Sequence, residues 1–207
     1  MSFFTGLTSG WLLITLSELG DKTFFIGAVL AMRHPRWWVF WGVTGGLATM
    51  TLLSVGMGQL AALLPHHYLR GLAAALFLGF GLKLLYDASR MSGKRTLAAE
   101  QNEALEVVER QERDVVTWSV KAVVLEAFSL TLLAEWGDRT QIATITLASR
   151  HDAYGVLLGA ILGHAMCAAM AVVCGHWIAG RIPERLLTAL GGMLFLSFGV
   201  LAAMGHA

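Results

Sequence analysis

Long apolar stretches, separated by short polar ones, divide the chain into six segments of membrane-spanning length. About 20 mostly apolar residues are enough for a helix to cross a bilayer. The pattern therefore predicts an all-α integral membrane protein with six transmembrane helices. The predicted helices cover roughly residues 5–32, 37–64, 68–88, 119–148, 153–180 and 185–205.

Charged residues interrupt the first and fourth segments, near or just beyond the middle. The first contains Glu18-Leu19-Gly20-Asp21-Lys22-Thr23, and the fourth contains Glu135-Trp136-Gly137-Asp138-Arg139-Thr140. An ionised side chain is costly to hold out of water, so charges within a membrane span indicate ion paths, proton relays or ligand sites. These two motifs are the first candidates for function.

The two motifs belong to an internal repeat. At an offset of 117 residues, 17–46 and 134–163 share 11 identities in 30 positions. The sequence thus predicts a first three-helix repeat at 1–88, a partly helical cytoplasmic linker at 89–118, and a second three-helix repeat at 119–207. Because three is odd, the second repeat enters the membrane reversed, which predicts two inverted three-helix repeats with the duplicated site between them.

Basic residues are distributed unevenly between the two sides of the predicted bundle. One side has only Arg70 and Arg150. The positive-inside rule places the richer side in the cytoplasm, so both termini are predicted to lie outside it, in an inner (plasma) membrane. The first apolar run has no basic region before it and is expected to remain as a span rather than to be a cleaved signal peptide. The richer side contains Arg33, Arg36, Arg90, Lys94, Arg95, Arg110, Arg113, Lys121, Arg181 and Arg185.

Composition agrees with a membrane protein. The 207 residues are 56% hydrophobic and 14% charged, with a mean hydropathy of +0.64, which leaves too little polar surface for a soluble globule. A net charge of +1 with scattered basic residues argues against nucleic-acid binding. In the linker, Glu103, Glu106 and Glu109 are expected on a short, solvated helix.

Two glycines four residues apart occur at matching positions of the second and fifth segments, at Gly42–Gly46 and Gly159–Gly163. We call these pairs the glycine steps. Glycines four residues apart allow close helix contacts in lipid. Their recurrence predicts that these helices pack against the helices that carry the motifs.

Each motif places two carboxylates three residues apart, so that they share one face of a helix. If the pairs meet, Glu18, Asp21, Glu135 and Asp138 supply four negative charges against the positive charges of Lys22 and Arg139, and the sum of minus two matches a divalent cation. Thr23, Thr140 and Gln141 would add oxygen atoms. Carboxylate, hydroxyl and amide oxygens suit Mn²⁺, Ca²⁺ or Mg²⁺ rather than Cu⁺ or Zn²⁺.

Other readings of these residues remain open. Glu18 with Lys22, and Glu135 with Arg139, could be structural ion pairs four residues apart. Glu126 could be a proton site or a partner of a lysine. A softer site built from His164, Cys167 and Cys174 is less favoured, because these residues have no counterparts in the second segment; the cysteines are expected to be packing residues.

At the motifs, the sequence resembles the small transmembrane cation transporters with a duplicated E-x-G-D-[KR]-[TS] motif. This family includes Mnx-type and MneA-type manganese transporters and their Golgi relatives. The resemblance covers both hydrophobic halves and includes the strings SELGDKTFF and AEWGDRTQIA. It implies Mn²⁺ export from the cytoplasm in exchange for protons. It also implies cation ligands at Glu18, Asp21, Glu135 and Asp138, helper oxygens at Thr23, Thr140 and Gln141, and charge balance or gating by Lys22 and Arg139.

Two alternatives keep the same residues. A Ca²⁺/H⁺ antiporter would use the same oxygens, because the two ions share ligand preferences. An intramembrane metalloenzyme would need a nucleophile or general base, and the duplicated motif offers neither; a structural membrane protein would leave the repeated carboxylates unexplained. The expected partners are therefore the lipid bilayer, a transported divalent cation and protons, with no resident cofactor and no enzymatic activity.

Overall fold

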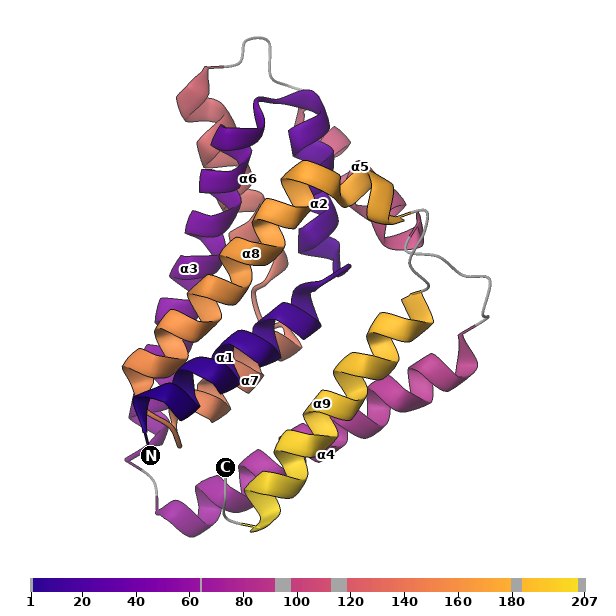
Figure 1. Cartoon of the computed structure of the whole chain (residues 1–207). Coiled ribbons are helices and arrows are strands. Elements are labelled where there is room, and N and C mark those ends of the chain that lie inside the picture. Colours follow the sequence, from indigo (N-terminus) through magenta and orange to yellow (C-terminus); the bar gives the residue numbers. More distant parts are fainter. Residues whose placement is uncertain (1, 64, 92–97, 113–118, 180–183, 205–207) are drawn as a thin grey trace.

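The computed structural model describes residues 2–63, 65–91, 98–112, 119–179 and 184–204, and all regular structure in these ranges is helical. Figure 1 shows the helices as a tall bundle with one antiparallel pair beside it. The described helices are α1 (Phe3–Glu18), α2 (Lys22–Arg33), α3 (Arg36–Ala61), α4 (His66–Arg90), α5 (Ala98–Glu112), α6 (Val120–Ala134), α7 (Arg139–Ala148), α8 (Ala153–Ala179) and α9 (Glu184–Met204).

Four described helices are long and apolar enough to cross a membrane: Arg36–Ala61, Tyr68–Arg90, Ala153–Cys174 and Arg185–Met204. The other two predicted spans are each broken at the charged motif. Their halves have 16 and 12 residues in α1 and α2, and 15 and 10 residues in α6 and α7. Each half is shorter than the roughly 20 residues that a span requires. The prediction of continuous helices is therefore wrong for these two segments.

The breaks occur at the motif glycines. Gly20 and Gly137 have φ angles of 80° and 82°, and they are the glycines with positive φ among the described residues. A side chain makes this left-handed conformation costly, whereas glycine adopts it readily. The motif glycine thus ends one helix and lets the next begin in a new direction (Figure 1).

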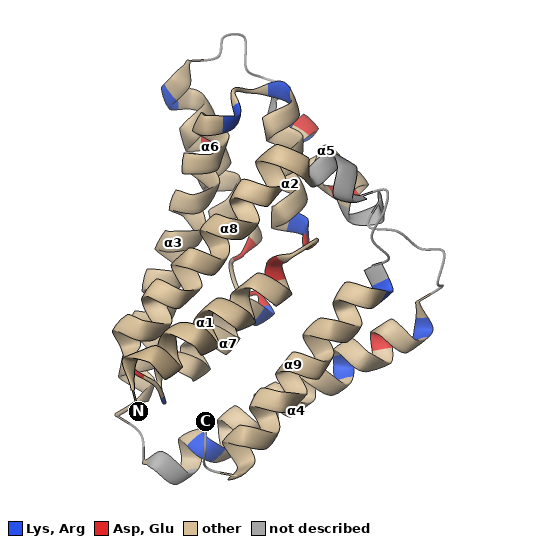
Figure 2. Ribbon diagram, in the orientation of Figure 1, with Lys and Arg blue, Asp and Glu red and all other residues tan. Residues whose placement is uncertain are grey.

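Apart from the helix ends at the two breaks, most described helix ends lie at one of two ends of the molecule. We call the end with the α2–α3 turn, the start of α6 and the C-terminal end of α4 the linker end, because the linker leaves and returns there. The α3–α4 and α7–α8 turns lie with the start of α1 and the end of α9 at the opposite, terminal end (Figure 1). Figure 2 shows basic residues at the α2–α3 turn, at the start of α6 and where α4 and α9 meet the linker end. Lys94, Arg95, Arg113 and Arg181 lie outside the described residues.

The two halves of the chain are interlocked through their glycine steps. A Cβ atom at Gly42 of α3 would lie 2.6 Å from the Ala127 Cβ of α6, and one at Gly163 of α8 would lie 3.1 Å from the Ile14 Cβ of α1. The expected packing of these helices against the motif helices is confirmed. Each motif helix packs on the long helix of the other half, which brings the two breaks together.

We expect Gly42→Ala to lower the free energy of unfolding of the detergent-solubilised protein by about 1–3 kcal/mol, because the added methyl group overpacks the α3–α6 contact. The variant should therefore melt at a lower temperature. Gly56→Ala is the matched control on the same helix, since a Cβ there meets no atom within 4 Å. The control should be neutral or slightly stabilising. Equal melting temperatures for the two variants would contradict the close α3–α6 contact.

The pair formed by α4 and α9 has internal symmetry. Gly81 of α4 lies under Leu196 of α9, and Gly199 of α9 lies under Leu78 of α4. The two contacts are equivalent in the repeat, because the offset of 118 residues relates Gly81 to Gly199 and Leu78 to Leu196. Phenylalanine contacts join the two helices: the Phe77 and Phe195 rings meet edge to face, with centroids 5.9 Å apart.

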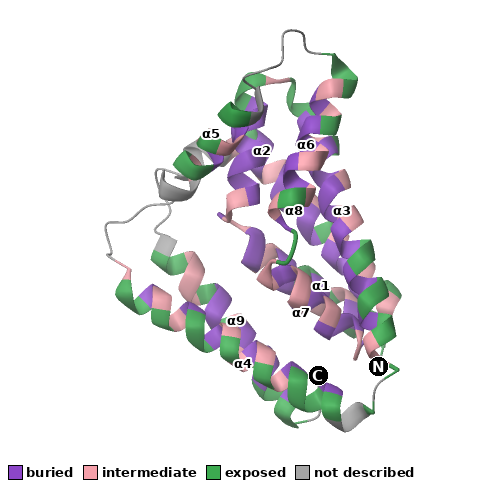
Figure 3. Cartoon of the chain, turned by 180° about the vertical axis from the view of Figure 1, so that it is seen from behind, coloured by how far each residue is buried: buried purple, intermediate pink, exposed green. Residues whose placement is uncertain are grey.

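Many large apolar residues of the long helices are exposed, and Figure 3 shows exposed positions along these helices. Trp41 and Leu52 of α3, Leu82 of α4 and Leu162 of α8 are all more than half exposed. An apolar outer surface over helices of this length fits a lipid environment.

The linker helix differs from its prediction. Ala104 and Val108 of α5 are fully buried against the core that contains α2, so one face of α5 is packed rather than solvated. Two ion pairs flank this contact, between the Lys22 Nζ and Glu103 Oε1 at 2.6 Å and between the Arg33 Nη2 and Glu109 Oε1 at 3.1 Å.

Candidate metal centre

Each break in the two motif helices is built in the same way. Glu18 is the last residue of α1 and Glu135 caps the C-terminus of α6. Asp21 and Asp138 are the N-caps of α2 and α7: the Asp21 carboxylate accepts the Lys22 N–H at 2.9 Å, and the Asp138 carboxylate accepts the Thr140 N–H at 3.2 Å. An acidic N-cap satisfies amide groups that the first helical turn leaves unpaired.

Each break joins the C-terminus of one half-helix to the N-terminus of the next, and the partly positive N-termini of α2 and α7 are capped by Asp21 and Asp138. α1 and α6 end at the breaks, so their C-terminal carbonyl groups, which carry partial negative charge, lie beside Glu18 and Glu135.

Three of the four predicted carboxylates form one cluster. Oxygen atoms of Glu18, Glu135 and Asp138 all lie within 4.8 Å of one another. The Glu18 side chain is 1% exposed and that of Glu135 is 4% exposed. Two oxygens that bind one Ca²⁺ ion at about 2.4 Å lie at most about 4.8 Å apart, so the three groups are close enough together to be candidate ligands of one divalent ion. We call these three residues the carboxylate cluster.

The motif threonines orient the two glutamates in equivalent ways. The Thr23 Oγ1 donates to the Glu18 Oε2 at 3.1 Å, and the Thr140 Oγ1 lies 3.1 Å from the Glu135 Oε2. These hydrogen bonds hold one oxygen of each carboxylate in place. The Glu18 Oε1 is buried with no hydrogen-bond partner among the described residues, and a buried acceptor of this kind is a natural cation ligand.

Asp21 is the fourth predicted ligand, and it has a different partner. The Arg139 Nη2 donates to the Asp21 Oδ2 at 3.1 Å, so the basic residue of the second motif binds the aspartate of the first. Lys22 instead pairs with Glu103 of the linker helix. Within the described residues, neither basic residue forms the ion pair with the glutamate four residues before it that the sequence left open as a structural alternative.

The remaining predicted helper has a structural role at the second break. The Gln141 Oε1 accepts the Gly137 N–H at 2.7 Å and so stabilises the turn. The corresponding residue of the first repeat is Phe24, which makes the two breaks unequal. Glu126 is buried on α6 and lies more than two turns before Glu135.

A cavity of about 160 Å³ leads from the first break toward the linker end. Asp21 and Arg139 lie on one wall, and Asp87 of α4 and Thr188 of α9 lie on the other. Glu18, Glu135 and Asp138 are not among its lining residues, so the cavity adjoins the Asp21–Arg139 pair rather than the carboxylate cluster itself.

Sequence reasoning missed two pairings, Arg139 with Asp21 and Lys22 with Glu103. Both join residues far apart in the chain, by 118 and 81 positions, and helical periodicity carries no signal for such contacts. It also gave no indication that Asp21 would lie outside the carboxylate cluster.

Comparison with known proteins agrees with this architecture. The family described as "Divalent cation/proton antiporter GDT1" matches residues 6–92 and 123–207, in two parts that flank the linker. The chain is 50% identical over 198 residues to "GDT1-like protein sll0615" of Synechocystis, covering 96% of both proteins. It is 41% identical to "GDT1-like protein 3" of Arabidopsis thaliana, over 96% of this chain and 70% of that protein. No solved structure is significantly similar to this chain.

The matched family covers both motifs, both glycine steps and the α4–α9 pair. Its two-part match agrees with a repeated architecture, and its description concerns transport rather than an enzymatic reaction. The chain is thus a multi-pass membrane protein that belongs to the GDT1 family of divalent cation/proton antiporters.

Proposed function

We propose that this protein exports Mn²⁺ from the cytoplasm in exchange for protons. The observation that carries the proposal is the carboxylate cluster, in which Glu18, Glu135 and Asp138 bring oxygen atoms within 4.8 Å of one another in the interior of the molecule. Oxygen ligands of this kind suit hard divalent ions.

The charge of the cluster gives a reason for proton coupling. Three ionised carboxylates carry a formal charge of minus three, and Asp21 is neutralised by Arg139 at 3.1 Å. A divalent ion leaves one negative charge, which one proton would balance. Because protons and metal ions bind the same oxygens, protons that arrive from one side displace the metal, and metal from the other side displaces protons.

The membrane arrangement that goes with this function has six crossings. α1 with α2, and α6 with α7, each make one broken crossing, so that each repeat contributes three. Broken spans with the binding site at the break, at the interface of inverted repeats, are a recurring design of secondary transporters. The equivalent contacts of Thr23 with Glu18 and of Thr140 with Glu135 support the repeat.

We assign the linker end to the cytoplasmic side of the cell's inner membrane and both termini to the other side. The basic residues at the α2–α3 turn and at the start of α6 support this orientation (Figure 2). The cavity lined by Asp21 and Arg139 then lies on the cytoplasmic side of the site.

Transport by the purified protein in liposomes tests the proposal. With a pH gradient imposed and an ion-sensitive dye inside, we expect Mn²⁺ to move opposite to protons, and a protonophore that collapses the gradient to stop the flux. Protein-free liposomes are the control. Movement of Ca²⁺ without Mn²⁺ would replace the proposed cargo, and movement of neither ion by folded protein would overturn the proposal.

A further inference from the structure

A small polar cavity lies beside Glu135, on the terminal side of the carboxylate cluster. It is enclosed by the terminal half of α3, the first turns of α7 and the middle of α8. The volume open to the centre of a water-sized sphere is about 10 Å³, which is enough for one water molecule or one ion. Its polar lining consists of Thr51, Ser54, Glu135, Thr140, Gln141, Thr144 and His164.

The repeat provides an internal comparison for this cavity. The equivalent cavity beside Glu18 is lined by Thr23, Phe24, Val43, Leu47, Cys167, Ala168 and Ala171. At the offset of 117 residues, His164 corresponds to Leu47, Thr51 to Ala168 and Ser54 to Ala171. The same place in the fold is therefore polar next to Glu135 and largely apolar next to Glu18.

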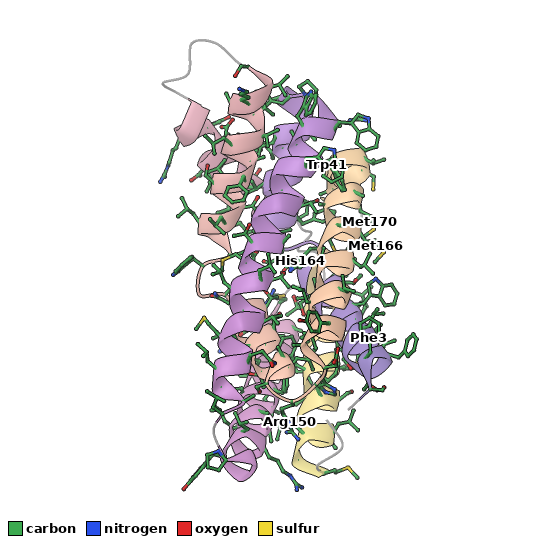
Figure 4. All side chains as sticks on the ribbon, turned by 90° about the vertical axis from the view of Figure 1, so that its left-hand side faces the viewer. Phe3, Trp41, Arg150, His164, Met166 and Met170 are labelled. Carbon is green, nitrogen blue, oxygen red and sulfur yellow. The ribbon has the colours of Figure 1, made fainter. Side chains whose placement is uncertain are left out.

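His164 is the feature of the polar cavity that packing leaves unexplained. Its side chain lies between α3 and α8 at mid-height of the molecule (Figure 4) and is 5% exposed. The Nδ1 atom has no hydrogen-bond partner among the described residues. A buried polar nitrogen without a partner costs free energy, and a bound cation would offset this cost.

The hydroxyl groups of α3 are arranged to present lone pairs. The Thr51 Oγ1 donates to the Leu47 carbonyl at 2.8 Å, and the Ser54 Oγ donates to the Met50 carbonyl at 2.7 Å. With the proton of each hydroxyl directed to the helix backbone, the oxygen lone pairs remain available to a cation.

We propose that this cavity is a second cation subsite, in which His164 supplies a nitrogen ligand beside Glu135 to a divalent transition-metal ion leaving the carboxylate cluster. The inference rests on the proposed transport of Mn²⁺. Imidazole nitrogen binds transition-metal ions, whereas Ca²⁺ and Mg²⁺ take oxygen ligands. The subsite thus favours Mn²⁺ over Ca²⁺.

The position of the subsite fits the direction of export. The cavity that contains Asp21 and Arg139 lies on the linker-end side of the cluster, and the His164 cavity lies on the opposite side of the cluster. An ion that passes Glu135 therefore meets His164 next. The apolar lining beside Glu18 offers no comparable oxygen or nitrogen set on α3 and α8.

Electron spin echo spectroscopy of bound Mn²⁺ tests the subsite directly, because a coordinated imidazole produces nitrogen-14 modulation of the signal. The probe is Mn²⁺ alone, added to the purified full-length protein. Glu18→Gln/Asp138→Asn weakens the cluster and keeps Glu135, so that the remaining bound Mn²⁺ reports on the cavity. We expect nitrogen modulation in this double variant, and its loss when His164→Leu is added.

Cys167→Ala is the matched control, since Cys167 lines the equivalent cavity beside Glu18; the modulation should persist in it. His164→Asn provides a second, polar replacement and should also lose the modulation. Mn²⁺ bound without nitrogen modulation in wild type and double variant would overturn the subsite and leave the proposed function standing. Modulation that survives both replacements of His164 would also overturn it, and failure of wild type to bind Mn²⁺ would overturn both proposals.

Discussion

Glu135→Gln is expected to reduce proton-driven Mn²⁺ transport at least about 100-fold, because it removes a charged ligand from the buried cluster. Changes that only disturb the partners of metal ligands already cost about 10- to 100-fold, and loss of a ligand should cost no less. Glutamine keeps the size of the side chain and can still accept the hydrogen bond from Thr140. The loss should therefore appear in transport in liposomes, with little change in melting temperature.

Glu18→Gln should have an effect of similar size, since Glu18 belongs to the same cluster. Glu106→Gln is the control for the loss of one carboxylate: Glu106 is exposed on α5, where it pairs with Arg110 at 3.7 Å. Near-normal transport by either cluster variant, with the other inactive, would contradict a single site shared by the two halves.

Arg139→Gln is expected to slow turnover about tenfold or more while lowering the Mn²⁺ concentration that gives half-maximal transport. Arg139 holds Asp21 at 3.1 Å and thereby keeps it out of the cluster. Without the guanidinium group, Asp21 becomes a fourth negative charge available to the cation. Stronger binding of the cargo without matching stabilisation of the transition state for release slows transport.

The turnover rate and the half-maximal Mn²⁺ concentration together distinguish the loss of the Arg139–Asp21 pairing from a general loss of stability. Arg139 and Asp21 form a partly buried ion pair, with side chains 30% and 23% exposed; loss of one partner leaves the other charge unpaired, so Arg139→Gln alone should also melt earlier. Asp21→Asn/Arg139→Gln removes both charges and should recover much of the stability and the normal half-maximal concentration. A higher half-maximal concentration in Arg139→Gln would show that the arginine attracts or positions the ion by another route.

Periodicity and repetition predicted much of this fold because both are local properties of the sequence. Segments three and six are continuous helices as expected, and the glycine steps at Gly42–Gly46 and Gly159–Gly163 make the close contacts that their spacing indicates. The break within the first and fourth segments occurs at Gly20 and Gly137. Its extent was missed, because hydropathy is the same for a continuous helix and for two half-helices of the same residues.

The linker helix shows a similar limit. The charges of Glu103, Glu106 and Glu109 predicted a helix, and α5 covers them. The burial of Ala104 and Val108 could not be predicted, because two small apolar residues among charges carry little signal until α2 is placed against them.

The sequence by itself determined the membrane character of the protein, the repeat and the acidic residues that meet at its centre. These follow from hydropathy, from identity at a fixed offset and from the high cost of charge in a membrane. The tertiary structure decided which acids share a site. It joined Asp21 to Arg139, left Glu18, Glu135 and Asp138 together, and placed His164 on only one side of them. Such choices depend on distances between helices that are remote in the chain, and an ion pair or a cavity forms only where those helices meet.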